Sequence, residues 1–332
     1  MPTDPTPSVP TPGPATRPPF DPELATVLEA LAEQLPASVT PDLIGPLREQ
    51  DRDVPIELVL AQHLGVTHRE TTVPGYEGAE LTVSVFAPRG HTGTGPGFFH
   101  THGGGMILGN RFGGIEVVLD WVERFRGVCV SVEYRLAPEH PDPYPVEDCY
   151  AALVWTSEHA EELGIDPDRL VIVGASAGGG LAAGTTLLAR DRSGPALAGQ
   201  VLIYPMIDDR NDSVSAQQMV GVGVWDRTSN DTGWDALLGE RRGTDDVSSY
   251  AAPARATDLS GLPPAFIDVG TAETFRDEDV AYATAIWAAG GVAELHVWPG
   301  GFHGFDLMVP HAALSRVMLE TRTAWVARLL GR

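Results

Sequence analysis

The chain has 332 residues, of which 43% are hydrophobic and 20% charged, so it is long enough to bury a sizeable core and has the composition of a globular protein. Its 45 acidic and 22 basic residues give a formal net charge of −23, which repels phosphate backbones and anionic lipid surfaces and argues against nucleic acid or a membrane as partner. All of the basic residues are arginines, and the absence of lysine excludes Schiff-base catalysis and a lysine-containing phosphate loop.

The N-terminal region divides into two parts. Residues 1–19 are rich in proline and poor in apolar groups, which predicts a disordered tail. They contain no basic segment followed by an apolar stretch, so we predict no secretory signal and a cytoplasmic location. From residue 20 to about residue 57, a helical pattern of leucines precedes the first strand candidate. This segment is predicted to fold over the domain that follows.

From residue 80 onward, apolar strands alternate with helical segments. The strand candidates are ELTVSVF, GVCVSVE, RLVIVG, QVLIYP and AFIDVG. The predicted helices lie near residues 116–126, 146–163, 177–190, 277–289 and 311–330. Continuous apolar strands indicate parallel pairing with both faces covered, and the alternation is typical of a doubly wound α/β sheet. We therefore predict one α/β domain over residues 20–332, in which Cys129 and Cys149 are small buried hydrophobes without a metal or redox spacing.

The alternation stops between about residues 208 and 258. No strand is predicted there, and Met219, Trp225 and Trp234 stand among polar residues. An insertion after the carboxyl end of a strand lies where open α/β sheets bind ligands, so this segment is a candidate lid. The alternative is a surface excursion with a small core of its own.

The residues Gly174-Ala175-Ser176-Ala177-Gly178 fit the pattern G-x-S-x-G. The pattern follows an apolar strand and precedes a helix, the context in which this motif exposes a serine hydroxyl on a strained turn above a sheet. The surrounding stretch, residues 170–189, has the length of a membrane span, but its Gly, Ser and Thr content favours a strand, a turn and a buried helix. Ser176 is therefore the candidate nucleophile.

A serine nucleophile needs a base to take its proton. His303 follows a strand and lies in the glycine-rich loop PGGFHGFD, where such a base is expected. His296 alternates within the strand-like AELHVW, and His311 begins the last predicted helix, so both have a structural explanation. His303 is the candidate base.

The base in turn needs a carboxylate, which should follow the strand AFIDVG. The loop there offers Glu273, Asp277, Glu278 and Asp279. The last three open a predicted helix, where acidic residues are common for capping and dipole reasons alone. Glu273, nearest to the strand end, is the candidate acid, with Asp277 as the alternative.

Three glycines at the end of an apolar run, Gly103, Gly104 and Gly105, let the backbone come close to a ligand. An acyl-transfer intermediate carries an oxyanion that needs N–H donors, and amides without side chains can supply them. With Gly103 as the turn, Gly104 and Gly105 are the candidate donors of an oxyanion hole, joined by the N–H of Ala177.

Four motifs stand in the order found in one family. They are HGGG at residues 102–105, YRLAPEHPDPYPVED at 134–148, GASAGGG at 174–180 and HGF at 303–305. Over about residues 75–330 the sequence resembles the hormone-sensitive-lipase-like (family IV) group of α/β-hydrolase esterases. The resemblance implies an α/β-hydrolase fold with a mostly parallel eight-stranded sheet, helices on both faces, a small helical lid built from residues 20–57 and 208–258, and hydrolysis of short acyl esters without a cofactor.

Two positions depart from that group's pattern. Ala175 stands where the group usually has aspartate, which removes a polar side chain beside the nucleophile. Glu273 stands where the group often has aspartate, although a subset of relatives looks similar in using glutamate. The longer side chain requires the acid loop to retreat slightly.

Together, the residues and the resemblance predict a serine carboxylesterase that hydrolyses short-chain acyl esters or small lactones through an acyl-enzyme. The alternatives are a non-catalytic small-molecule-binding protein on a hydrolase scaffold and an amidase with the same three residues. We expect a small ester as partner and neither cofactor nor metal, because His100 and His102 alternate without a nearby acidic or thiol ligand. A homo-oligomer is compatible with the sequence.

Overall fold

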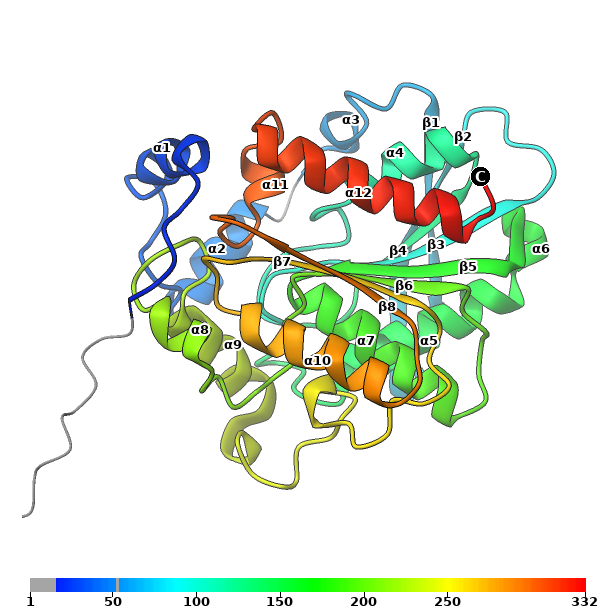
Figure 1. Cartoon of the computed structure of the whole chain (residues 1–332). Helices are drawn as coiled ribbons and strands as arrows, with labels where there is room; N and C mark the ends of the chain where they lie inside the picture. The colour runs from blue at the N-terminus through cyan, green and yellow to red at the C-terminus, as the bar shows by residue number, and fades with distance from the viewer. Residues whose placement is uncertain (1–15, 52–53) are drawn as a thin grey trace, which may run out of the picture.

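A computed structural model describes residues 16–51 and 54–332 (Figure 1). Most of the predicted disordered tail, residues 1–15, lies outside the described residues. At the start of the described part, the guanidinium of Arg17 lies over the ring of Phe20, 3.8 Å from its centroid.

An eight-stranded sheet runs through the protein in the order β1-β2-β4-β3-β5-β6-β7-β8. Its strands are β1 (Val66–Pro74), β2 (Glu80–Pro88), β3 (Gly95–Thr101), β4 (Val128–Val132), β5 (Ile165–Ala175), β6 (Gly199–Ile203), β7 (Ala265–Gly270) and β8 (Ala293–Trp298). β2 pairs antiparallel with β1 and β4, and every other pairing is parallel. The predicted mostly parallel eight-stranded sheet is confirmed.

The first strand, β1, was not among the strand candidates. It has a neighbour on one side only, and only Val66 and Val73 of its nine-residue span are buried. An edge strand of this kind carries no continuous apolar run. Its sequence, VTHRETTVP, therefore lacks the apolar pattern from which the other strands were predicted.

Helices cover both faces of the sheet, as predicted (Figure 1). On one face lie α4 (Glu116–Phe125) and α12 (Ala313–Leu329), and on the other lie α5 (Tyr144–Glu158), α7 (Ala177–Asp191) and α10 (Arg276–Ala288). The short helices α6 (Ala160–Leu163) and α11 (Phe305–Met308) follow α5 and precede α12. The stretch that resembled a membrane span divides into the end of β5, a turn and the buried helix α7. In the described part of the chain, no helix combines the length and the apolar character that a bilayer crossing needs.

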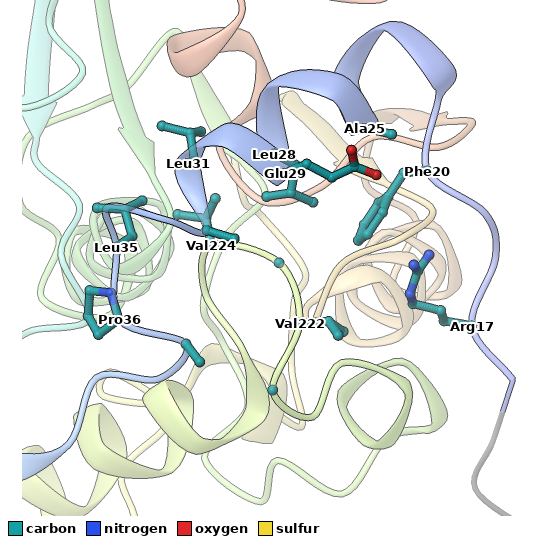
Figure 2. A pocket seen from close by; sticks show the side chains of 14 residues that line it. Arg17, Phe20, Ala25, Leu28, Glu29, Leu31, Leu35, Pro36, Val222 and Val224 are labelled. Carbon is teal, nitrogen blue, oxygen red and sulfur yellow. The ribbon is translucent and has the colours of Figure 1, made fainter.

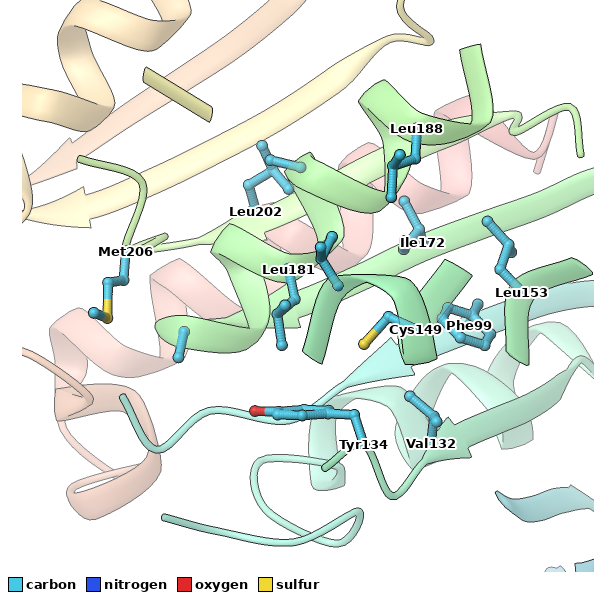
Figure 3. Packing of buried hydrophobic residues seen from close by; sticks show 14 of the residues in the cluster. Phe99, Val132, Tyr134, Cys149, Leu153, Ile172, Leu181, Leu188, Leu202 and Met206 are labelled. Atoms are coloured by element: carbon cyan, nitrogen blue, oxygen red, sulfur yellow. The ribbon is translucent and has the colours of Figure 1, made fainter. Parts of the chain in front are cut away.

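Two hydrophobic cores fill the space between the sheet and its helices. Figure 3 shows the core beneath α5 and α7, where Phe99 and Ile172 of the strands meet Cys149, Leu153 and Leu181 of the helices. Each fully buried side chain of this size contributes about 1.5–3 kcal/mol. Both cysteines are buried and free, as predicted, and burial raises the pKa of each thiol.

Four further helices gather at one end of the sheet, on the left of Figure 1. They are α1 (Pro22–Leu31) and α2 (Ile44–Asp51) from the N-terminal segment, and α8 (Val214–Gln218) and α9 (Arg227–Leu238) from the insertion after β6. The short helix α3 (Ile56–Val59) lies apart from them, near α4 at the top of the view. The prolines of the N-terminal segment divide its helical pattern, because a proline inside a helix removes a hydrogen bond. The two segments bind each other: Ser38 donates to Asp226 at 2.9 Å, and the N–H of Val39 donates to the Ser229 hydroxyl at 2.8 Å.

The strand register brings several loops to this same end. Thr101 of β3 lies opposite Gly174 of β5, Ala175 lies opposite Ile203 of β6, and Ile203 lies opposite Asp268 of β7. Because these strands are parallel, the loops that follow them all leave from one edge of the sheet. That edge is the place where open α/β sheets bind ligands.

A buried ion network attaches α12 to this edge. Arg322 is 1% exposed and donates to Asp268 of β7 at 2.8 Å and to Asp306 of α11 at 2.5 Å. The hydroxyl of Tyr204 donates to the other oxygen of Asp306 at 2.9 Å. The guanidinium therefore holds two buried carboxylates, one from the sheet and one from the loop region that precedes the last helix.

Replacing Arg322 by methionine should destabilise the protein severely, because it leaves Asp268 and Asp306 buried without their cation. We expect a loss of about 3–5 kcal/mol in the free energy of unfolding, measured by urea denaturation. Arg328→Met is the matched control on the same helix: Arg328 pairs with Glu294 at the surface, and such exposed pairs contribute about 0–1 kcal/mol. Equal losses in the two variants would contradict the expected large contribution of the buried network to the free energy of unfolding.

Candidate active site

Ser176 lies in the turn between β5 and α7. Its backbone angles are φ 58° and ψ −125°, a strained conformation for a residue with a side chain. Neighbouring main chain holds the turn in place: the N–H of Ser176 donates to Ile203 at 2.8 Å, and its carbonyl accepts from the N–H of Met206 at 2.9 Å. The strained conformation is thus held by the end of β6 and by the segment that follows it.

The glycines on either side of Ser176 are required by close packing. A Cβ atom at Gly174 would lie 2.2 Å from the carbonyl oxygen of Gly178, and one at Gly178 would lie 2.1 Å from the carbonyl oxygen of Thr101. Both distances are far below any real contact of a Cβ atom with backbone. The G-x-S-x-G pattern is therefore a steric requirement of this turn.

His303 lies in the loop between β8 and α11, beside the serine. Its Nε2 is 2.9 Å from the Ser176 Oγ and its Nδ1 is 3.1 Å from the Glu273 Oε2. The rings of Tyr204 and Phe275 pack edge-on against the imidazole, with centroids 4.8 and 5.2 Å away. The ring plane is therefore fixed from both sides while each nitrogen faces one polar partner.

Glu273 lies in the loop between β7 and α10 and is 1% exposed. Its second oxygen, Oε1, accepts from the N–H of Phe275 at 2.9 Å, so both carboxylate oxygens are occupied. A carboxylate that contacts Nδ1 orients the imidazole and leaves Nε2 to face the serine hydroxyl. The structure thus brings Ser176, His303 and Glu273 into one hydrogen-bonded line.

Asp277, the alternative acid, lies elsewhere. Its Oδ1 accepts from Arg276 at 2.7 Å and its Oδ2 accepts from the N–H of Ser215 at 2.8 Å. Burial opposes the charge of this carboxylate, but those hydrogen bonds outweigh it and hold its pKa below the ordinary value. Asp277 connects α8 of the insertion to α10 and does not contact His303.

The next two acids do not cap α10 either. Glu278 is buried and accepts the N–H groups of Ile207 and Asp208, at 2.9 and 3.1 Å. Asp279 is fully buried, and neither of its oxygens has a hydrogen-bond partner in the described part of the chain. Burial raises the pKa of both carboxyls well above the ordinary value. The expectation that these acids serve helix capping is therefore wrong for Glu278 and Asp279.

The three glycines after β3 form a tight loop opposite Ser176. Gly104 has φ +115°, and a Cβ atom there would lie 2.2 Å from the carbonyl oxygen of Leu108. Within residues 16–51 and 54–332, the N–H groups of Gly104 and Gly105 have no backbone acceptor. Ala177 is the first residue of α7, so its N–H has no acceptor within the helix. In the described part of the chain, the backbone thus leaves the N–H groups of Gly104, Gly105 and Ala177 without a main-chain partner.

Residues of the 134–148 motif hold this glycine loop in place, a role that the sequence alone did not indicate. The ring of Tyr134 stacks on that of His102, with centroids 4.1 Å apart, and its hydroxyl donates to the His102 carbonyl at 2.8 Å. Arg135 donates to the buried carboxylate of Asp148 at 2.8 and 2.7 Å. The only signal for this role was the position of the motif in the family resemblance.

A cavity of about 510 Å³ opens above Ser176. Among the residues that the structure describes, no acidic side chain and no arginine lines it; its described walls are apolar apart from the serine, His303, Gln50, Tyr204 and the backbone of the glycine loops. The segment after α1 contributes residues including Leu35 and Pro36, and the insertion contributes Val224 and Trp225. Both segments predicted as lid elements thus border the cavity.

His100 and His102 each have a protein partner at Nδ1. His100 Nδ1 is 2.8 Å from the Ser131 hydroxyl, and His102 Nδ1 is 2.8 Å from the Gly103 carbonyl. Burial lowers the pKa of His100 to about 3. In the described ranges, no group of three or more His, Cys, Asp or Glu side chains is placed to hold a metal ion.

Comparisons with known proteins agree with this geometry. Residues 98–307 match a family model described as the alpha/beta hydrolase fold. Carboxylesterase NlhH of Mycobacterium tuberculosis (strain ATCC 25618 / H37Rv) is 35% identical over 303 residues, covering 88% of this chain and 92% of its own. Esterase LipI of the same strain is 31% identical over 324 residues, covering 92% and 95%.

Two solved structures superimpose over nearly the whole chain. The bacterial heroin esterase matches with a TM-score of 0.85 and 38% identity, covering 94% of this chain and 98% of its own. The esterase LipW from Mycobacterium marinum matches with a TM-score of 0.83 and 31% identity, covering 95% and 98%. The chain therefore belongs to the hormone-sensitive-lipase-like (family IV) group of the α/β-hydrolase family.

Proposed function

We propose that the protein is a serine carboxylesterase that hydrolyses small, uncharged esters of short acyl chains through an acyl-enzyme on Ser176. The relatives named as carboxylesterases and esterases support the ester hydrolase activity itself. The observation that carries the mechanism is the line from the Ser176 Oγ to His303 Nε2, at 2.9 Å, and from His303 Nδ1 to Glu273, at 3.1 Å.

In the first step, the Ser176 oxygen attacks the ester carbonyl carbon while His303 Nε2 takes the hydroxyl proton. The carbonyl oxygen becomes an oxyanion, which the N–H groups of Gly104, Gly105 and Ala177 stabilise. The C–O bond to the alcohol then breaks, and the same proton passes from Nε2 to the departing alkoxide. In the second step, water attacks the acyl-enzyme by the same route and releases the acid. Glu273 stabilises the transient imidazolium.

The cavity favours small neutral substrates. Among its described lining residues, none carries a charge that could neutralise an ionic substrate, and Ala175 adds a methyl group where the pattern of the family that the sequence resembles usually has aspartate. We propose that residues 20–57 and 208–258 act as a lid over one hydrolase domain spanning residues 20–332, because both segments border the cavity and bind each other through Asp226 and Ser229.

Replacing Ser176 by alanine should reduce turnover of p-nitrophenyl acetate by roughly 10⁴-fold or more, because the nucleophile is lost. The wild-type protein should gain the mass of one fluorophosphonate adduct, whereas Ser176→Ala should gain none. Near wild-type turnover in the variant would remove Ser176 as the nucleophile. An unlabelled wild-type protein would favour the binding-protein alternative.

The acid can be assigned by comparing Glu273→Gln with Asp277→Asn. The first variant keeps the shape but loses the charge that orients and stabilises the imidazolium, so we expect kcat to fall by about 10⁴-fold. The second variant weakens contacts with Arg276 and Ser215 only, and we expect kcat to change little. Steady-state kinetics of both variants measures the difference, and the reverse order would transfer the role to Asp277.

The proposed role of the Gly104 and Gly105 N–H groups as oxyanion donors can be tested with Gly104→Ala. The added Cβ would collide with the Leu108 carbonyl and displace the N–H donors, so kcat should fall by about 100- to 1,000-fold, the effect of losing one oxyanion donor. Gly290→Ala is the control, since Gly290 also has a positive φ, +80°, but its Cβ would meet nothing within 4 Å and it does not line the cavity. A similar loss in both variants would mean that backbone strain, and not the donors, explains the effect.

A further inference from the structure

We propose that Leu35 and Val224 form a wall that closes one side of the substrate cavity and limits the length of the ester chain that the enzyme accepts. This inference rests on the proposed function, because it concerns the same cavity above Ser176. It adds the residues that determine the size of the substrate.

A second cavity, of about 280 Å³, lies beside the first. It is bounded by α1 on one side and by the loop of residues 221–224 on the other (Figure 2). Leu28, Leu31 and Val222 give it apolar walls, and Arg17 and Glu29 are the charged side chains among its lining residues. Such a space suits the hydrocarbon part of a ligand better than an ionic group.

Three residues line both cavities: Leu35, Pro36 and Val224. Figure 2 shows Leu35 and Pro36 on the segment that follows α1, and Val224 on the loop across from it. Among the described residues, the two cavities therefore share only two apolar side chains and one proline ring. Leu35 is 40% exposed, which places much of its surface against open space and not in a packed core.

The loop that carries Val224 is held firmly on its far side. A Cβ atom at Gly105 would lie 2.2 Å from the Trp225 ring, so that ring rests on the cradle of oxyanion donors. The Trp225 carbonyl accepts from the Thr274 hydroxyl at 2.8 Å, next to Glu273. Asp226 accepts from the N–H of Gly221 at 2.9 Å and from Ser38 at 2.9 Å, which joins both sides of the wall.

Truncating Leu35 or Val224 should therefore join the two cavities. The loop itself should stay in place, because Trp225 and Asp226, which hold it, are unchanged. The chain of an ester that ends against Leu35 or Val224 could then extend into the second cavity. Both the acyl chain and the alkyl chain of the alcohol have the required hydrocarbon chemistry. Two substrate series separate these cases: p-nitrophenyl esters of increasing acyl length, and alkyl acetates of increasing alcohol length.

The experiment compares Val224→Ala and Leu35→Ala with the wild type in both series. We expect the longest accepted chain to increase in one series, with kcat/KM for the first chain length beyond the wild-type limit rising about tenfold or more, the usual effect of one methylene in an apolar pocket. Val222→Ala and Leu31→Ala are matched controls, because they remove the same groups from the second cavity but line it alone. These controls should keep the wild-type length profile.

A filling variant provides the reverse test. Ala32 lines only the second cavity, so Ala32→Trp added to Val224→Ala should occupy the new space and restore the wild-type limit. An unchanged limit in both wall variants, or an equal gain in the Val222→Ala and Leu31→Ala controls, would overturn the proposal. Failure of the proposed function is a separate result, since the wild-type protein would then neither hydrolyse p-nitrophenyl acetate nor accept a fluorophosphonate.

Discussion

The close passage of the main chain around Ser176 is the constraint on which the rest of the site depends. Gly174, Gly178 and Thr101 lie so near one another that no side chain fits at either glycine. This packing holds the serine in a conformation that an unsupported chain would avoid. It also brings the end of β3, and with it the glycines at 103–105, next to Ser176. The position of Ser176 and that of the proposed N–H donors thus both follow from the same close packing of backbone.

His303 and Glu273 approach Ser176 from two loops that come later in the chain. Buried polar residues hold the His303 loop in position. Tyr204 connects the two systems: its ring packs against His303, and its hydroxyl donates to Asp306, which Arg322 neutralises. The histidine is therefore positioned by its carboxylate partner and also by a network that reaches the last helix. A longer acid such as Glu273 is accommodated because the Phe275 N–H holds its second oxygen.

The strands and helices around the sheet follow from apolar patterns, which are local and strong in a parallel sheet covered on both faces. The site residues Ser176, His303 and Glu273 could be chosen from motif context, because each follows a strand that the pattern located. Edge strand β1 could not be found in this way, since its alternation is mostly polar. The surroundings of Glu278 could not be predicted from local sequence either, because its hydrogen-bond partners Ile207 and Asp208 lie about 70 positions earlier in the chain.

One residue of the insertion, Trp225, contacts both the glycine loop after β3 and the loop that carries Glu273. Its ring rests on Gly105 and its carbonyl is bound by Thr274, the neighbour of the acid. A displacement of this tryptophan that enlarged the entrance would therefore also move the backbone at Gly105 and the loop that carries Glu273.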